Sequence, residues 1–359
     1  MNAKELFILD EYRQQKNTFE HLENLVVQKL DTLLKAADVK IYAINHRIKD
    51  EKSLEGKLER KGDKYNDLHD ITDILGVRII CFFQDDVDKI ARLAEKTFAI
   101  DWEKSIDKRK FLNVNSFGYL ALHYICSLKI GEDAEADKEG LTHFRFELQM
   151  CSLLQHVWAS MEHDLGYKTK FGVPKAVARD FSRLAGLLEI ADEHFSRIRD
   201  TVATYIVSTH QKIVNDNAND IPLDSVSLDE YMRYSNSMGQ FLKRIAKICN
   251  SEIVHESLEN YLEELSWFKL ETIGDLQRLL ADNAELAFRM AEDMLSCAEL
   301  DILNSTVALR FLCRAELING EYTKKQAAQF FYLSSKNQER SEKYAEKLFS
   351  DYGKQEQNQ

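Results

Sequence analysis

Proline is nearly absent from this chain, and its scarcity limits the fold more than any other feature of the sequence. Among 359 residues there are two prolines, Pro174 and Pro222, and 13 glycines. Because proline interrupts helices and glycine marks turns, this composition favours long helices over a loop-rich β protein. With 44 % hydrophobic and 30 % charged residues, the chain has the balance of an ordinary globular protein that is long enough for two domains.

Strand-like patterns lie before Pro174, where they alternate with helical ones. The expected strands cover residues 39–44, 76–83, 119–130 and 143–150. The expected helices cover residues 3–36, 53–61, 85–98 and 151–167. After Pro174 the periodic segments are all helical, with a polar break at residues 215–225. We predict an N-terminal helix (1–38), an α+β domain with a mixed sheet flanked by helices (39–173) and an all-α C-terminal region (174–359).

The charge of the chain argues against general binding to nucleic acid. The formal net charge is −12, and a local exception gathers Lys104, Lys108, Arg109 and Lys110 in one short stretch. The N-terminus mixes charges into apolar positions, unlike a signal peptide, and no later stretch has the length of a membrane span. We therefore expect a cytoplasmic protein with no membrane partner.

Charged residues stand on or beside strands that are otherwise apolar. Asp73 precedes the run GVRIICFF, Arg78 lies inside it, and Glu147 lies within HFRFELQM. Two carboxylates on neighbouring strands can hold Mg²⁺ against a triphosphate, because Mg²⁺ takes one or two carboxylates together with phosphate oxygens. The alternative is structural: Asp73 caps a turn and Glu147 pairs with Arg145 or Arg78.

Four segments, in order, resemble the synthetase motifs of the RelA/SpoT family. They are HRIKDEKSLEGKLERK, DITDILGVRII, FGYLALH and FELQMCSLLQHVWASMEHDLGYK, spread over about residues 39–170. The resemblance implies a nucleotidyltransferase fold related to DNA polymerase β. It also implies an activity, the Mg²⁺-dependent transfer of pyrophosphate from ATP to the 3′-hydroxyl of GDP or GTP. The products would be the alarmone (p)ppGpp and AMP.

The resemblance also assigns roles to single residues. Arg47 and Arg78 would clasp adenine, a role that suits a planar guanidinium. Lys49, Ser53 and Lys57 would meet the ATP phosphates, with Lys61 a looser candidate. Asp73 and Glu147 would hold Mg²⁺, and Glu147 would help to deprotonate the attacking hydroxyl. The acceptor nucleotide would be bound by Tyr119, His123, Lys108 and Gln149; for Gln149, as for His163, structural hydrogen bonding is an equal alternative.

Departures from the family pattern concern the acceptor. Phe117 stands where many alarmone synthetases have an Asn that helps to read guanine, Ala121 replaces a Ser, and Cys151 with Ser152 replaces Arg-Thr. None of these changes removes a proposed metal ligand. The acceptor could therefore instead be the 3′ end of tRNA, as in toxins of this type, or an adenosine nucleotide.

Two further interpretations follow from the organisation of the chain. Residues 1–38 cannot supply the hydrolase domain of the bifunctional relatives, so the resemblance implies a synthetase without hydrolase. A different class of function, an inactive nucleotide-binding regulatory protein, is disfavoured because Arg47, Asp73, Arg78 and Glu147 are intact. The helical C-terminal region could form a homo-oligomer, sense a partner or clamp the active site.

Overall fold

The computed structural model describes residues 2–107, 121–167, 175–256 and 258–353. The chain divides into two compact units, residues 1–199 and 200–359. The long helix α7 (Lys175–Val214) contributes to both. No helix in the described ranges has the length and apolar character that crossing a membrane requires.

The first unit is built on a mixed sheet whose strands run in the order β1-β2-β6-β5-β3, with β4 paired to β5. β2 and β6 are parallel and the other pairs are antiparallel. The strands are β1 (Ile41–Ile48), β2 (Leu75–Cys81), β3 (Phe98–Ile100), β4 (Ile106–Asp107), β5 (Leu122–Leu128) and β6 (Phe146–Ser152). The predicted mixed sheet flanked by helices is confirmed.

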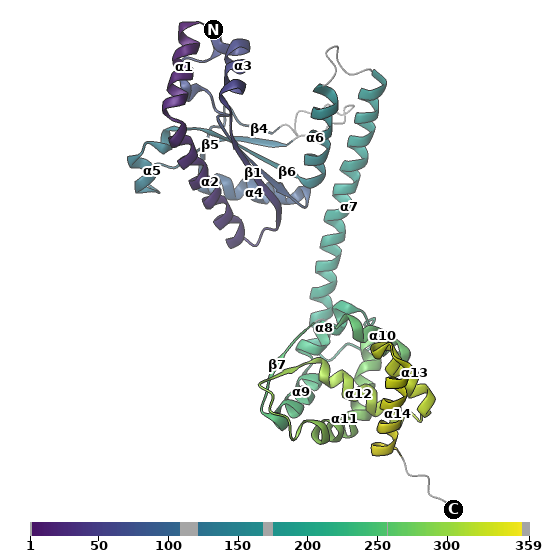
Figure 1. Cartoon of the computed structure of the whole chain (residues 1–359). Coiled ribbons are helices and arrows are strands. Elements are labelled where there is room, and N and C mark those ends of the chain that lie inside the picture. The colour runs from purple at the N-terminus through teal and green to yellow at the C-terminus, as the bar shows by residue number, and fades with distance from the viewer. Residues whose placement is uncertain (1, 108–120, 168–174, 257, 354–359) are drawn as a thin grey trace, which may run out of the picture. The chain divides into compact units, whose positions relative to one another are not determined.

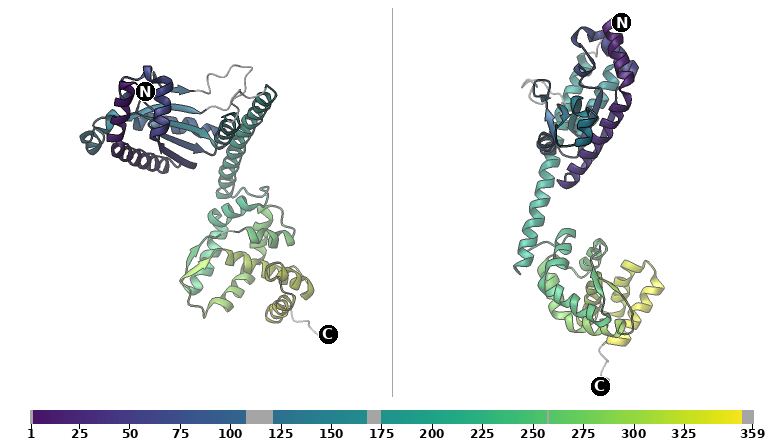
Figure 2. Two further views of the ribbon diagram at one scale, coloured as in Figure 1. Left: turned by 45° about the horizontal axis from the view of Figure 1, so that its top comes forward. Right: turned by 90° about the vertical axis from the view of Figure 1, so that its left-hand side faces the viewer.

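Helices cover this sheet on two sides. In both Figure 1 and Figure 2, α1 and α2 lie on one side of the sheet and α6 and α7 on the other. The helices of the unit, besides part of α7, are α1 (Ala3–Gln14), α2 (Lys16–Ala36), α3 (Glu51–Lys61), α4 (Gln84–Thr97), α5 (Ala134–Lys138) and α6 (Leu153–Tyr167), with short 3₁₀ turns at Gly62–Lys64, Leu68–Asp70 and Leu141–His143. The single helix expected over residues 3–36 is thus two helices that meet at Gln15.

The core of the first unit lies between one face of the sheet and the helices α2 and α4. Val77 of β2 and Leu148 of β6 are paired side by side and buried, and they join Val26 of α2 and Ile90 of α4 in one cluster. Because side chains alternate along a strand, the residues next to Val77 on β2 and next to Leu148 on β6 point to the opposite face of the sheet. Those residues are the polar ones considered below.

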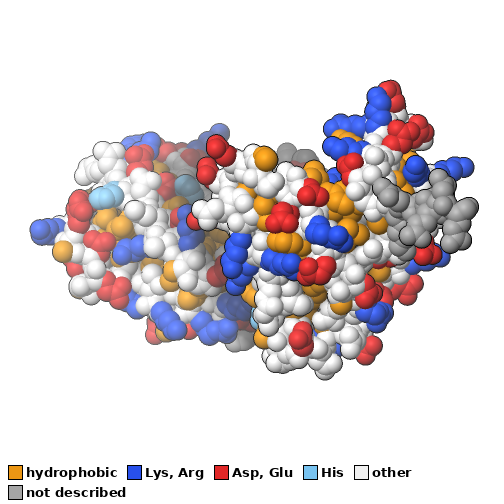
Figure 3. Space-filling model, turned by 90° about the horizontal axis from the view of Figure 1, so that it is seen from below, with side chains coloured by type: hydrophobic (Ala, Val, Ile, Leu, Met, Phe, Trp, Pro, Cys, Tyr) orange, Lys and Arg blue, Asp and Glu red, His pale blue; other side chains and the backbone are white. Residues whose placement is uncertain are grey.

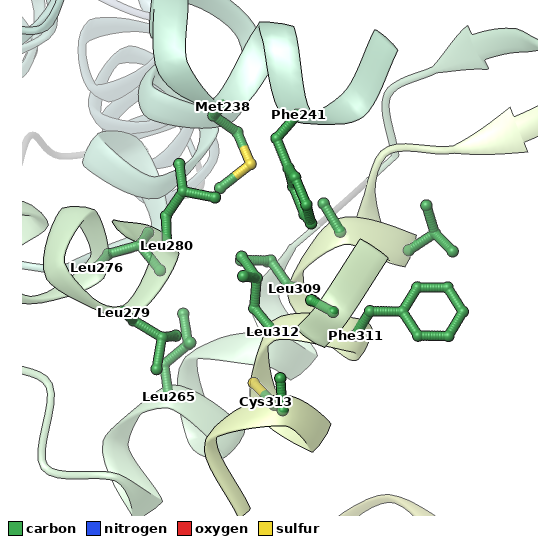
Figure 4. Packing of buried hydrophobic residues seen from close by; sticks show 14 of the residues in the cluster. Met238, Phe241, Leu265, Leu276, Leu279, Leu280, Leu309, Phe311, Leu312 and Cys313 are labelled. Carbon is green, nitrogen blue, oxygen red and sulfur yellow. The ribbon is translucent and has the colours of Figure 1, made fainter. Parts of the chain in front are cut away.

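The second unit is helical, and the all-helical expectation is confirmed with one small addition, a pair of three-residue parallel strands, β7 (Glu252–Val254) and β8 (Ile302–Asn304). Its helices, after the end of α7, are α8 (Ser225–Tyr234), α9 (Asn236–Cys249), α10 (Glu259–Trp267), α11 (Ile273–Leu295), α12 (Thr306–Asn319), α13 (Lys324–Ser335) and α14 (Gln338–Tyr352). Figure 4 shows Met238 of α9, Leu280 of α11 and Leu312 of α12 directed into a common core. Figure 3 shows acidic and basic side chains interspersed on the face that it draws.

Candidate active site

One face of the sheet carries charged and amide side chains. Residues that are paired directly across neighbouring strands point to the same face, as do residues two apart on one strand. Gly76 is paired with Arg47 on β1 and with Glu147 on β6, while Arg78 is paired with Gln149. The polar face of the sheet therefore brings together four of the predicted site residues: Arg47, Arg78, Glu147 and Gln149.

Arg47 and Arg78 are diagonal neighbours on this face, because Arg47 is opposite Gly76 and Arg78 lies two residues further along β2. Diagonal neighbours on an antiparallel pair are about 7–8 Å apart. That separation is close to what a flat ring needs when it is stacked between two planar groups. The positions of the two arginines thus suit the clasp that the family resemblance implies for them.

A continuous chain of contacts crosses the same face. Nδ1 of His123 lies 2.7 Å from Oε1 of Glu147, and Nε2 of Gln149 donates to Oε2 of Glu147 at 3.0 Å. Nε of Arg78 donates to Oε1 of Gln149 at 2.8 Å, and Nη1 of Arg78 lies 3.4 Å from Nδ1 of His156 on α6. The amide of Gln149 thus accepts from a cation and donates to an anion, which fixes the orientation of both.

The surroundings of Glu147 keep it ionised. Burial raises the pKa of Glu147, but the hydrogen bond and charge of His123, with the hydrogen bond from Gln149, lower it further than burial and the charge of Asp73 raise it. Of the two alternative partners of Glu147, Arg145 instead lies 3.6 Å from Asp101, and Arg78 is joined to Glu147 through Gln149. Glu147 is therefore held as a carboxylate that can accept a proton or bind a cation.

Asp73 lies in the turn before β2, between two lysines. Its Oδ1 accepts from Nζ of Lys57 at 2.6 Å, and its Oδ2 lies 3.0 Å from Nζ of Lys49. Burial raises the pKa of Asp73, but the hydrogen bond and charge of Lys57 and the charge of Lys49 bring it below its ordinary value. The hydroxyl of Tyr12 on α1 donates to the carbonyl of Lys49 at 2.6 Å, so the first helix fixes the backbone at this point.

These residues surround one pocket of about 470 Å³. The side of the pocket away from the sheet is formed by Ala159, Ser160 and His163 of α6. The predicted site residues that line it are Arg47, Lys49, Asp73, Arg78, Glu147, Gln149 and His163. Lys57 reaches it through its hydrogen bond to Asp73, and His123 through its contact with Glu147.

Other predicted residues lie elsewhere. Ser53 does not line the pocket, because its hydroxyl donates to Asp50 at 2.7 Å at the start of α3, and Lys61 is exposed at the end of that helix. The contact of Ser53 with ATP phosphates stays a prediction. Tyr119 and Lys108 lie outside the described residues, as do Arg109 and Lys110.

Sequence reasoning assigned no site role to Tyr12 or His156. Tyr12 is separated by 37 residues from the carbonyl that it binds, and His156 by 78 residues from Arg78. The helical period at Tyr12 indicated a buried position, but not its partner. Burial and the charge of Arg78 lower the pKa of His156, which favours the neutral ring that can accept from a guanidinium.

The residues in the pocket fit a magnesium ion. Asp73 and Glu147 line the same cavity, and they are close enough to one another for the charge of Asp73 to raise the pKa of Glu147. Mg²⁺ is bound in such sites by one or two carboxylates together with substrate phosphates. Asp73 and Glu147 are the residues that would hold it.

Comparison with known proteins gives a consistent result for this part of the chain. Residues 46–171 match the family model described as "Region found in RelA / SpoT proteins". GTP pyrophosphokinase YjbM of Bacillus subtilis is 27 % identical over 162 residues, which are 44 % of this chain and 72 % of the relative. GTP pyrophosphokinase YwaC of the same organism is 28 % identical over 159 residues, with the same coverage of 44 % and 72 %.

Solved structures are also similar to this chain. The structure of small alarmone synthetase 2 from Bacillus subtilis is 24 % identical, covers 53 % of this chain and 99 % of its own, and has a TM-score of 0.45. The structure of small alarmone synthetase 1 from the same organism, bound to its product pppGpp, is 26 % identical, covers 54 % of this chain and 98 % of its own, and has a TM-score of 0.44.

Proposed function

We propose that this protein transfers the β,γ-pyrophosphate of ATP to the 3′-hydroxyl of GDP or GTP, because residues 46–171 match the model of a region found in RelA / SpoT proteins. The observation that carries the proposal is a pocket that is lined by two carboxylates, Asp73 and Glu147, together with the cations Arg47, Lys49 and Arg78. A triphosphate with a divalent cation has the charges that such a pocket matches.

The residues of the pocket divide the work. Arg47 and Arg78 hold the adenine ring between them, and Lys49 and Lys57 bind the phosphates. Glu147 takes the proton of the acceptor hydroxyl while the oxygen of that hydroxyl forms a bond to the β-phosphorus of ATP. The bond from that phosphorus to the bridging oxygen of the α-phosphate breaks, and AMP leaves. When bound, Mg²⁺ neutralises the negative charge that develops on the transferred group and on AMP.

The acceptor is proposed on different grounds from the donor. Both curated relatives carry the name GTP pyrophosphokinase, which supports a guanine nucleotide. His123 and Gln149 both contact Glu147, and an acceptor hydroxyl must lie near Glu147 for this carboxylate to reach its proton. We assign these two residues to the acceptor side of the site.

The test is a transfer assay with ATP labelled at the γ-phosphate, in the presence of Mg²⁺ and one acceptor at a time. We expect label on GDP or GTP and the release of AMP. Glu147→Gln should abolish the transfer, since the amide cannot accept the proton, whereas the exposed Glu135→Gln should leave it unchanged. Label on ATP or on deacylated tRNA would replace the guanine acceptor, and the absence of transfer to any acceptor would overturn the proposal.

A further inference from the structure

The carboxylate of Asp73 is paired with two ammonium groups. Each of its oxygens has its own ammonium partner, Lys57 at 2.6 Å from Oδ1 and Lys49 at 3.0 Å from Oδ2. The three side chains are less than one-third exposed, at 28 %, 19 % and 17 % for Asp73, Lys57 and Lys49. A magnesium ion binds carboxylate oxygen at about 2.0–2.1 Å. While both lysines remain in place, a magnesium ion at that distance would have to share each oxygen with an ammonium group that repels it.

The net charge around the pocket points the same way. Two carboxylates, Asp73 and Glu147, face four cationic side chains: Arg47, Lys49, Lys57 and Arg78. The formal excess is positive, so a free divalent cation would enter a region that repels it, in surroundings where partial burial strengthens the repulsion. A nucleotide triphosphate reverses this balance, because its phosphates bring several negative charges.

The residue type suits an exchange of partners. A lysine ammonium is a compact charge on a flexible stem, and its three donors can rotate to a new acceptor, whereas arginine holds a fixed planar geometry. Lys49 and Lys57 are also the side chains that the proposed function assigns to the ATP phosphates. The same two cations therefore have two competing anionic partners, the carboxylate of Asp73 and the triphosphate.

We propose that Lys49 and Lys57 act as an internal counter-ion that keeps Asp73 closed to metal until a nucleotide triphosphate draws them away. Metal and nucleotide then enter together, and Asp73 competes with the phosphates for the two lysines. This inference rests on the proposed function for the identity of the nucleotide. The exchange of partners itself rests on the two ion pairs that Asp73 forms with Lys49 and Lys57.

Two binding measurements on the full chain test the exchange without a transfer assay. The first titrates Mn²⁺ alone and follows the free ion by electron paramagnetic resonance, with and without a non-hydrolysable ATP analogue. We expect the affinity for Mn²⁺ to rise by at least about tenfold when the analogue is present. Strong binding of Mn²⁺ without nucleotide would overturn the proposal.

The second measures binding of the analogue in the presence of EDTA by calorimetry. Asp73→Asn frees both lysines, so this variant should bind the metal-free analogue at least as tightly as the original protein, although it loses transfer. Lys57→Met should have the opposite pair of effects, with tighter binding of Mn²⁺ alone and weaker binding of the analogue. The exposed Asp63→Asn removes a carboxylate in the 3₁₀ turn after α3 and should change neither affinity.

The outcomes separate the exchange from the proposed activity. If Asp73→Asn weakens binding of the metal-free analogue, the ion pairs are structural and the exchange is wrong, while the transfer assay can still succeed. If Lys57→Met leaves binding of Mn²⁺ alone unchanged, Lys57 does not close the site. If the original protein binds no analogue, both the exchange and the ATP site of the proposed function are wrong.

Discussion

At the scale of single residues, the amide of Gln149 joins two parts of the site that have different tasks. Its oxygen accepts from Arg78, which the proposed function places on the adenine side, and its nitrogen donates to Glu147, which the proposed function places on the acceptor side. An amide can do both because it has a donor end and an acceptor end, whereas an ionised carboxylate has acceptors alone. Gln149 is therefore a positioning residue whose polarity, and not merely its size, should matter.

We predict that Gln149→Glu places a second anion against Glu147 and raises the pKa of that carboxyl group, because a nearby like charge disfavours ionisation. Glu147 is then ionised, and able to accept a proton, over a narrower pH range. The acidic limb of the pH profile of transfer therefore moves to higher pH. The loss of rate should therefore be largest at low pH and should shrink as the pH rises above the new pKa. The measurement is the pH profile of kcat for the variant and the original protein.

The matched control is Gln28→Glu on the exposed face of α2, which makes the same chemical change away from the pocket. It should leave the pH profile where it is. A Gln149→Glu variant that lost rate equally at every pH would mean that Gln149 holds the fold of the site and does not tune Glu147.

The residues on the polar face were predictable, and their partners were not. GVRIICFF is an apolar run that contains Arg78, and HFRFELQM places Glu147 among apolar neighbours, so a common polar site could be inferred. The ion pairs from Asp73 to Lys49 and Lys57 depend on how α3 packs beside the start of β2, which no local pattern reports. The same holds for the contact of Arg78 with His156.

At the scale of elements, the end of β6 is tied to α7 by a buried polar contact. The hydroxyl of Ser152 donates to Oδ2 of Asp192 at 2.5 Å, and both residues are fully buried. The same hydroxyl accepts from the backbone of Gln155 in the first turn of α6. Ser152 therefore links three elements: the strand β6, which carries Glu147, the helix α6, which lines the pocket, and the helix α7, which carries Asp192.

We predict that Ser152→Ala destabilises this junction by about 1–3 kcal/mol, the usual cost of removing one partner from a buried polar group. Hydrogen exchange measured by mass spectrometry on the full chain should show faster exchange in the part of α7 near Asp192. Peptides from α11 in the second unit serve as an internal reference. Ser182→Ala, which removes a bond to the carbonyl of Ala178 within α7, should leave the junction unchanged.

Unchanged exchange in Ser152→Ala would mean that Asp192 is held by its other interactions.

Elements were predicted from sequence where their pattern is long, and missed where it is short. The helix over 85–98 appears as α4 (Gln84–Thr97), but the strands β3 and β4, with three and two residues, gave no signal because they are too short to show a period. The acidic stretch at 131–140, between two of the expected strands, contains α5 with Ala136 buried.

At the scale of the whole molecule, the question is where the first folding unit ends. The sequence places the end of the α+β domain at residue 173, because Pro174 interrupts the pattern there. The compact units divide instead between residues 199 and 200, inside a continuous helix. A proline marks where a helix begins, but it carries no information about what the helix packs against, so the predicted boundary at 173 remains a proposal to be tested.

The contacts of α7 favour the later boundary. Trp158 of α6 is 5 % exposed, and its ring meets Phe181 edge to face at 6.4 Å, with Ala185 buried beside it. Further along, Arg199 pairs with both Asp85 and Asp86 at the start of α4. A chain that stops at residue 173 loses all of these partners and leaves Trp158 open to water.

We predict that a fragment of residues 1–204 folds cooperatively and binds the ATP analogue with the affinity of the full chain. The extra turn beyond Arg199 keeps the new terminal carboxylate away from Asp85 and Asp86. A fragment of residues 1–173 should be less stable by roughly 3 kcal/mol or more, since it exposes a large buried aromatic side chain. Urea unfolding followed by the fluorescence of Trp102 and Trp158 measures the difference. Equal stability of the two fragments would instead place the end of the domain at 173, and the first part of α7 would then belong to the helical region.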